Sequence, residues 1–189
     1  ILPLSLINGD SSRLLSVSPK QRRYFLDWGV FHVEQTFLDV WQRYGRALKQ
    51  RNAALRQNYT SKIIQGWDHE LSNSAQLLHQ ARKLYIESLE LPFQNYLTKL
   101  CDFENKTIDL RYERGWPSNT DFLENLTESL QLDRSIGFTQ KGPHRADINV
   151  WINGSPASQY ASNGQQKLIV CALYLAQLEV YRRIIKSQC

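Results

Sequence analysis

The sequence contains no methionine and only three cysteines. Cys101, Cys171 and Cys189 lie far apart, and no pair has the close spacing of a zinc or redox motif, so we expect no disulfide framework and a reducing cytoplasm. No apolar run reaches the roughly 18 residues of a membrane span, and no signal-peptide pattern is present. Because the chain opens on Ile1 rather than Met, we expect it to be an internal part of a longer protein.

Several catalytic motifs are also missing. The four histidines have no metal-ligand spacing with carboxylates or cysteines, and no G-x-S-x-G elbow occurs. There is no G-x-x-x-x-G-K-[ST] phosphate loop, and no apolar strand ending in paired carboxylates follows the last helical pattern. Glu124 and Glu128 lie one turn apart on a helix whose other face is apolar, which indicates that the two carboxylates lie on the solvated face of that helix. We therefore expect no ATP hydrolysis and no resident metal for this chain alone.

What is present is a folded composition with a mild positive charge. The 189 residues are 42% hydrophobic and carry a formal charge of +5, which fits one domain or two small pieces. From Val40 to Trp67 there is no acidic residue but six basic ones. Arg46, Lys49 and Arg56 fall away from the apolar stripe of their helix. That face is either solvated or in contact with nucleic-acid phosphates.

The first half of the sequence predicts helices. A helix begins at Pro19 and runs to about Gly29, and two long amphipathic helices, near 34–57 and 67–100, form an antiparallel hairpin. Pro92 should kink or end the second one. The apolar stripe of the first comprises Phe37, Trp41, Tyr44, Leu48 and Leu55. Trp28, Trp41 and Trp67 occupy stripe or cap positions, which favours core packing over stacking platforms for bases.

The second half mixes strands and helices. Alternation predicts a strand over 107–112 and another over 148–152, with a hairpin turn at Asn153-Gly154. A helix is expected over 121–132, a short strand over 136–139 and a last helix over 164–186 that is buried on all sides. We predict a mainly helical α+β fold with three segments: short strands over 1–17, a helical arm over 18–105 and a second lobe over 106–189.

The start of the last helix allows two interpretations. Ser162 and Gln165 form an S-x-x-Q capping box, which is sufficient for a structural cap. Gly164, however, weakens the first turn, and Lys167 places a cation near the positive end of the helix dipole. A glycine, a serine hydroxyl and a lysine at one helix start also suit a bound phosphate. The residues alone leave both interpretations open.

A Gly-Pro turn precedes His144 and Arg145, beside Lys141. These basic residues either belong to a structured loop between strands or face nucleotide or DNA. The sequence does not choose between the two.

Four blocks of the sequence resemble one family. Ser162-Asn163-Gly164-Gln165-Gln166-Lys167, with the Leu-x-x-Cys-Ala-Leu-x-Leu-Ala-Gln run that follows, resembles the signature motif of ABC-type ATPase heads, and the double glutamine resembles that of the bacterial RecF family. Ser18–Trp28, Leu48–Asn52 and Gly142–Asp147 resemble three further RecF blocks, in the same order. The family usually has leucine and arginine where this chain has Ala161 and Asn163.

The resemblance implies a mechanism for the whole protein. It places a phosphate loop before Ile1 and a Walker B strand after Cys189, with ATP and Mg²⁺ as cofactors. Ser162, Gly164 and Gln165, supported by Lys167, would close on ATP held by the other protomer, so that ATP drives homodimerisation on gapped or duplex DNA. It implies the second lobe of an ATPase head for 106–189, and a RecR-like partner, RecO and RecA. The alternative function is a non-catalytic helical scaffold that docks a partner protein.

Overall fold

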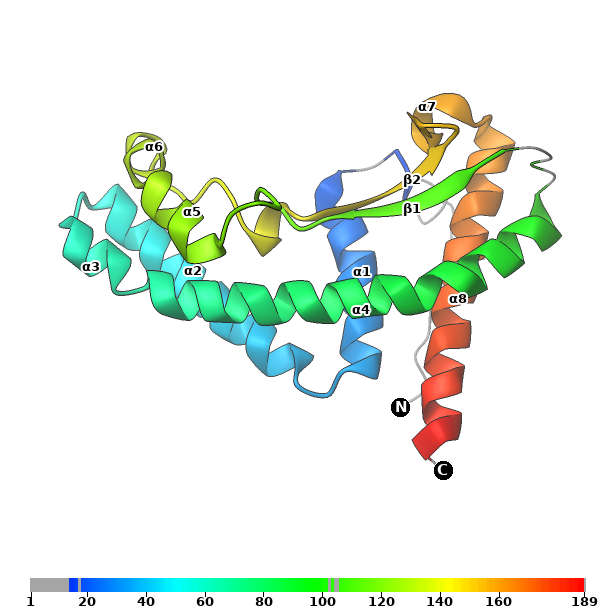
Figure 1. Ribbon diagram of the computed structural model, residues 1–189, viewed down its shortest axis with the longest axis horizontal. Coiled ribbons are helices and arrows are strands. Elements are labelled where there is room, and N and C mark those ends of the chain that lie inside the picture. The colour runs from blue at the N-terminus through cyan, green and yellow to red at the C-terminus, as the bar shows by residue number, and fades with distance from the viewer. Residues whose placement is uncertain (1–13, 17, 102, 104–105, 189) are drawn as a thin grey trace. The chain divides into compact units, whose positions relative to one another are not determined.

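The computed structural model describes residues 14–16, 18–101, 103 and 106–188 (Figure 1). Its α-helices are α1 (Pro19–Val33), α2 (Phe37–Arg56), α3 (Ser61–Gln65), α4 (Asp68–Leu100), α5 (Phe122–Glu128), α6 (Leu130–Ile136), α7 (Ala157–Tyr160) and α8 (Asn163–Gln188). A 3₁₀ turn, η2, spans Pro143–Arg145. Strands β1 (Ile108–Glu113), β2 (Asp147–Ile152) and β3 (Ser155–Pro156) form one sheet in the order β1-β2-β3. The prediction of a mainly helical α+β fold is confirmed.

The chain forms two compact units that alternate along the sequence. Unit 1 comprises Ile1–Val33, Arg82–Tyr112 and Asp147–Cys189, and unit 2 comprises Glu34–Ala81 and Glu113–Ala146. This division differs from the contiguous segments expected from the sequence, because α4 contributes its first residues to one unit and the rest to the other. The assignment of an arm and a lobe to contiguous segments stays a prediction. The strands expected over 1–17 lie almost entirely outside the described residues.

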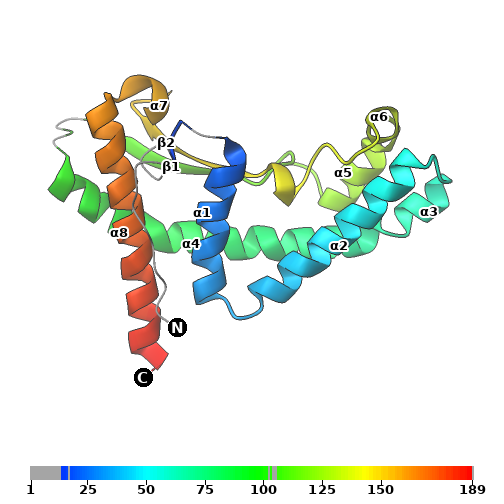
Figure 2. The same cartoon turned by 180° about the vertical axis from the view of Figure 1, so that it is seen from behind.

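Unit 1 is built around the packing of α1 on α8 and on β2, which can be followed in Figures 1 and 2. Phe25, Leu26 and Val30 are buried on the inner side of α1. The ring of Phe25 meets that of Tyr174 edge-on at 5.1 Å, and the Gln177 side chain donates a 3.0 Å hydrogen bond to the Phe25 carbonyl. Helix α1 continues to Val33, four residues beyond the predicted end.

Two ion pairs fix α1 within unit 1. The guanidinium of Arg22 donates two hydrogen bonds of 2.7 Å to the carboxylate of Asp147, at the start of β2. Arg82 of α4 donates bonds of 2.8 and 3.0 Å to Asp27. Burial alone would raise the pKa of Asp147, but the hydrogen bonds and charge of Arg22 hold that pKa below its usual value. Both pairs are bidentate, the geometry that restricts orientation most.

The hairpin predicted at Asn153-Gly154 is confirmed. Both residues have positive φ, 49° and 79°, as a two-residue type I′ turn requires. Strands β2 and β3 pair antiparallel across it, with Trp151 opposite Pro156 and Ile152 opposite Ser155.

Helices α4 and α8 depart from expectation in part. Pro92 lies inside α4 and does not end it. Ile169, Val170 and Ala172 of α8 are buried, but Leu168 is 37% exposed. The expectation that α8 is buried on all sides is therefore wrong for the described residues. No described helix is long and apolar enough to cross a membrane, and no cluster of three or more potential metal ligands occurs in the described part of the chain.

Unit 2 contains α2, α3, the first part of α4, α5 and α6. Ala54 and Leu55 of α2 form one buried cluster with Ile64 of α3 and Leu130 of α6. The single helix predicted over 121–132 is instead two, which meet at Ser129. The strand predicted over 136–139 is absent, because Gly137 adopts a left-handed conformation with φ of 85° and ends α6 in a turn.

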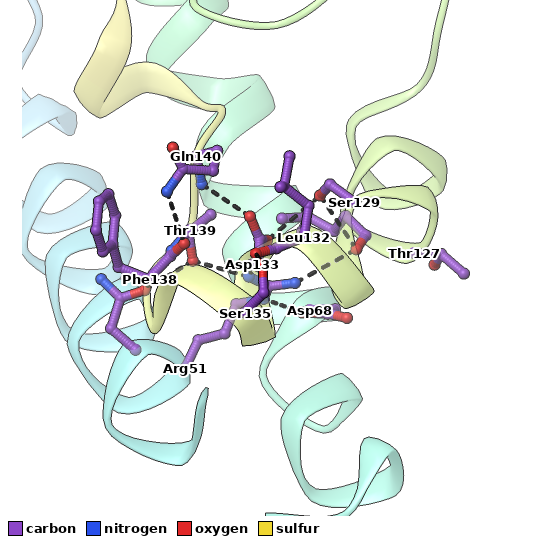
Figure 3. A network of polar contacts seen from close by, with 12 residues as sticks. Arg51, Asp68, Thr127, Ser129, Leu132, Asp133, Ser135, Phe138, Thr139 and Gln140 are labelled. Atoms are coloured by element: carbon purple, nitrogen blue, oxygen red, sulfur yellow. Dashed lines mark hydrogen bonds and ion pairs between the residues drawn. The ribbon is translucent and has the colours of Figure 1, made fainter. Parts of the chain in front are cut away.

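A buried arginine lies at the centre of unit 2 (Figure 3). The Arg51 side chain is fully buried and donates hydrogen bonds of 2.7 Å to Asp68, 2.6 Å to Asp133 and 2.8 Å to the Thr139 hydroxyl. The other carboxylate oxygen of Asp133 accepts a bond from the Gln140 backbone amide. One cation thus connects α2, the start of α4, α6 and the segment after α6.

The two carboxylates of this network are not equivalent. Oδ2 of Asp68 is buried without a hydrogen-bond partner among the described residues. Burial raises the pKa of Asp68 above its usual value, and this outweighs the opposite influence of Arg51. Asp68 is therefore the member whose charge the fold accommodates least well.

Replacing Arg51 by Met should lower the free energy of unfolding by about 3–5 kcal/mol, because both carboxylates would stay buried without a cation. Burial already raises the pKa of Asp68, and loss of the opposing influence of Arg51 would raise it further, so the native state would bind more protons than the unfolded state. The deficit should shrink as the pH falls from about 7 to about 4. Urea unfolding followed by circular dichroism at several pH values measures this.

The matched control is Arg46→Met on the exposed side of the same helix, which should change stability by less than about 0.5 kcal/mol. Equal stability of Arg51→Met and the parent chain would show that Arg51 does not support the two carboxylates.

Candidate functional site

The start of α8 is an exposed, capped helix terminus in unit 1. The Gln165 amide donates to Oγ of Ser162 at 3.3 Å, and the Ser162 amide donates to Oε1 of Gln165 at 3.0 Å. The predicted capping box is thus present. Ser162, Gly164 and Lys167 are exposed and Gln165 is half-buried, so the first turn of α8 and Lys167 in the second turn are accessible.

Capping leaves donor capacity at this turn. Oγ of Ser162 accepts from Gln165, so its hydroxyl proton stays available to a ligand. The first N–H groups of a helix have no partner within it. The capping box satisfies those of Ser162 and Gln165, and no hydrogen bond among the described residues uses those of Asn163 and Gly164. A Cβ on Gly164 would meet nothing closer than Oγ of Ser162 at 3.9 Å. Contacts within the described chain therefore do not require glycine at this position.

Hydrogen bonds of Gln166 and buried residues of α8 fix the position of this turn. The Gln166 side chain donates to the backbone carbonyls of Ser158 and Ala161, at 3.1 and 2.9 Å. Ile169 and Val170 anchor the next turn in the core. An anion at this site would meet donors whose positions are fixed before it arrives.

Three basic residues of α2 lie on the exposed face of unit 2. Arg46, Lys49 and Arg56 are exposed, and no hydrogen bond or ion pair joins them to another described residue. Arg43, one turn earlier, is paired instead with Glu70 at 2.8 Å, and this pairing raises the pKa of Arg43. The predicted phosphate contacts are therefore accessible.

Two basic residues of the Gly142–Asp147 loop differ in their surroundings: His144 is hydrogen-bonded within unit 2, and Arg145 is exposed. The His144 Nε2–H donates to the Thr139 carbonyl at 3.0 Å, and in the neutral ring Nδ1 accepts from the Tyr44 hydroxyl at 2.6 Å. Both ring nitrogens are thus used within unit 2. Arg145 is exposed, with its guanidinium 5.7 Å from the Phe138 ring centre. Of the pair, Arg145 is the residue that is available to a ligand.

The interpretation of Trp41 and Trp67 as core residues is wrong. They are 49% and 38% exposed, whereas Trp28 is half-buried with its ring 4.1 Å from that of His32. The error comes from omitting alanines: Ala47 and Ala54 are buried, which shifts the buried arc of α2 away from Trp41. Arg51, seven residues after Tyr44, falls on the buried arc, and this spacing could have identified it from the sequence.

Known proteins resemble the chain over its whole length. No protein-family model matches it. The RecF DNA replication and repair protein of Pseudomonas aeruginosa (strain LESB58) is 47% identical over 189 residues, which cover 100% of this chain and 51% of that protein. RecF of Pseudomonas fluorescens (strain SBW25) is 45% identical over 190 residues, with the same coverage. The chain is homologous to RecF.

The fold agrees with solved RecF structures. The recombination mediator protein RecF-ATP of the RecFOR pathway superimposes with a TM-score of 0.86 at 22% identity, over 95% of this chain and 51% of that one. RecF-ATPrS gives a TM-score of 0.84 at 23% identity, over 94% and 51%. The chain therefore spans about half the length of the RecF proteins that it matches, and the family resemblance stated from the sequence is confirmed.

Replacing Gly164 by Ala should raise the free energy of unfolding by up to about 1 kcal/mol, since alanine is the better helix former and its Cβ has room. Thermal unfolding followed by circular dichroism tests this. Ser162→Ala is the control in the opposite direction, because loss of the cap should cost about 0.5–2 kcal/mol. A destabilised Gly164→Ala chain would mean that the fold itself requires the glycine.

Proposed function

We propose that this chain is part of an ATP-dependent, DNA-binding dimer of recombinational repair, in which the start of α8 acts on nucleotide held by the partner protomer. The observation that carries the proposal is the 47% identity to RecF along the whole chain. The exposed turn of Ser162, Gly164 and Gln165, with unused donors, supports it.

In the proposed mechanism, a phosphate loop of one protomer, outside this chain, would hold ATP with Mg²⁺. The Ser162 hydroxyl and the first N–H groups of α8 of the other protomer donate to the γ-phosphate, and Lys167 adds positive charge. Hydrolysis by water would convert ATP to ADP and phosphate, and loss of these contacts would release the dimer. ATP would thereby control how long the dimer stays on gapped or duplex DNA.

Arg46, Lys49 and Arg56 contribute phosphate contacts in this proposal, and Arg145 is an additional candidate. Their exposure supports the assignment. His144 orients the loop through its two internal hydrogen bonds rather than by touching the ligand. A RecR-like protein and RecO are proposed partners by analogy with the RecFOR pathway named for the structural relative. RecA is proposed as a partner from the family resemblance of the sequence alone.

The alternative function, a scaffold that docks a partner protein, has one observation in its favour. Leu84 and Leu91 of α4 are 58% and 63% exposed and lie seven residues apart, so they share one face of the helix. Exposed leucines at this spacing are typical of helix–helix docking.

Ser162→Arg in the whole protein should abolish ATP-driven dimerisation and leave ATP affinity unchanged. The arginine would fill the space proposed for the γ-phosphate, and charged hydrogen bonds worth roughly 1.5–3 kcal/mol each would be lost at two symmetric sites. Nucleotide binding and sedimentation with and without ATP measure the two effects.

Loss of nucleotide affinity with persistent ATP-driven dimers would show that Ser162 is not a contact in trans. Wild-type behaviour in both assays would reduce Ser162 to a helix cap and favour the scaffold.

Replacing Arg46, Lys49 and Arg56 together by Gln should weaken DNA binding similarly for all sequences. It should also make the slope of log affinity against log salt concentration shallower. The slope should change by roughly 0.9 for each phosphate of duplex DNA that the variant no longer neutralises. Fluorescence anisotropy over a salt series measures both.

The charge-matched control replaces Lys83, Lys99 and Lys186, which are exposed on other elements. An unchanged slope in the α2 variant, or equal losses in both, would assign the basic face of α2 to solvent.

A further inference from the structure

A surface pocket in unit 2 joins the basic face of α2 to an exposed tryptophan. The pocket has a volume of about 510 Å³ and is lined by Arg43, Arg46, Ala47, Lys49, Gln50, Trp67 and Glu70. Arg46, Lys49 and Gln50 project from consecutive turns of one helix face. Trp67 comes from the segment between α3 and α4. We call this the Trp67 pocket.

The charges of the pocket do not cancel. Glu70 is the only acidic residue of its lining, and both of its oxygens are used by Arg43, at 2.8 and 3.2 Å. Arg46 and Lys49 therefore remain as two cations without a counter-ion among the described residues. Such a surface complements an anionic ligand, and because both side chains are long and exposed, they can follow spaced phosphates.

Trp67 is held in place while remaining accessible. Its amide donates to the Ile64 carbonyl at 3.1 Å, and its own carbonyl accepts the Leu71 amide at 3.0 Å, so its backbone continues into α4. The following residue, Asp68, is bonded to Arg51 in the buried network. The side chain is nevertheless 38% exposed. A partly exposed indole with a fixed backbone thus lines the same pocket as two unpaired cations.

We propose that the Trp67 pocket binds an unpaired nucleotide of single-stranded DNA, with the base stacked on Trp67 and the adjoining phosphates neutralised by Arg46 and Lys49. Bases within a duplex are already stacked on their neighbours, so an indole face selects unpaired ones. Stacking is tolerant of base identity, and the pocket is expected to show little sequence preference. The inference rests on the proposed DNA-binding function and assigns part of it to the single strand beside a duplex.

The test compares Trp67→Leu with Trp67→Phe in the whole protein. Leucine keeps an apolar side chain but removes the π face, whereas phenylalanine retains one. With a short fluorescein-labelled oligothymidylate, Trp67→Leu should weaken binding about ten-fold, and Trp67→Phe should stay near the wild-type affinity. Neither variant should change affinity for a blunt-ended linear duplex, which has no unpaired base.

Trp41→Leu is the matched control, because Trp41 is exposed on the same unit but does not line the pocket. It should bind oligothymidylate as the wild type does. Quenching of intrinsic tryptophan fluorescence by the oligonucleotide should persist in Trp41→Leu and diminish in Trp67→Phe, and this gives a readout of stacking besides affinity.

The proposal would be overturned if Trp67→Leu kept wild-type affinity for single-stranded DNA, or if Trp67→Leu and Trp41→Leu lost equal affinity for it. If duplex binding were retained in either case, the proposed DNA-binding function would not be affected. If the wild-type protein bound neither probe, the DNA-binding function and the pocket assignment would both fail. Equal losses on single strand and duplex in Trp67→Leu would show that the residue supports the general basic surface and is not a stacking site.

Discussion

Unit 2 depends on the burial of one guanidinium. Arg51 joins residues that lie 17, 82 and 88 positions away in the sequence, through Asp68, Asp133 and Thr139. A buried cation is stable only when its hydrogen bonds are satisfied, so the network allows few alternative arrangements of these segments. It also fixes the rotation of α2 about its own axis. With Arg51 turned inward, the helical period directs Arg46 and Lys49 to the opposite, exposed side.

Some residues of the blocks that carry the family resemblance hold the fold together. Arg22 and Asp147 come from two different blocks and form one bidentate pair in unit 1. In unit 2, the Asn52 side chain accepts both the amide and the hydroxyl of Thr139, each at 2.8 Å. A block can therefore be recognisable because it holds the fold, and membership of a block does not make a residue a ligand contact.

Periodicity predicted most of the elements but little of what fixes their orientation. The spacing of large apolar residues identified α2 and α4, and the Asn153-Gly154 pair identified the hairpin, because these signals are local. Arg51 was missed as a core residue because a charge is expected outside unless distant partners neutralise it, and Asp133 lies 82 residues away. The break at Ser129 was also missed, and the turn at Gly137 carries a local signal, a glycine directly after the last helical residue, that the prediction did not use. The capping box at the start of α8 could be predicted from the sequence because its donor and acceptor are only three residues apart.

A cap and a phosphate site at the start of α8 are compatible. Capping uses a lone pair of the Ser162 oxygen and leaves its proton, so a ligand would add a hydrogen bond without removing one. Lys167 is harder to explain by capping alone. A cation in the second turn opposes the helix dipole, and no described ion pair offsets it. An anion beyond the helix start would reverse the sign of that interaction. Glycine at 164, which no internal contact requires, would let the anion approach the backbone closely. The two features that weaken this turn as an isolated helix end are therefore the two that a bound phosphate would make favourable.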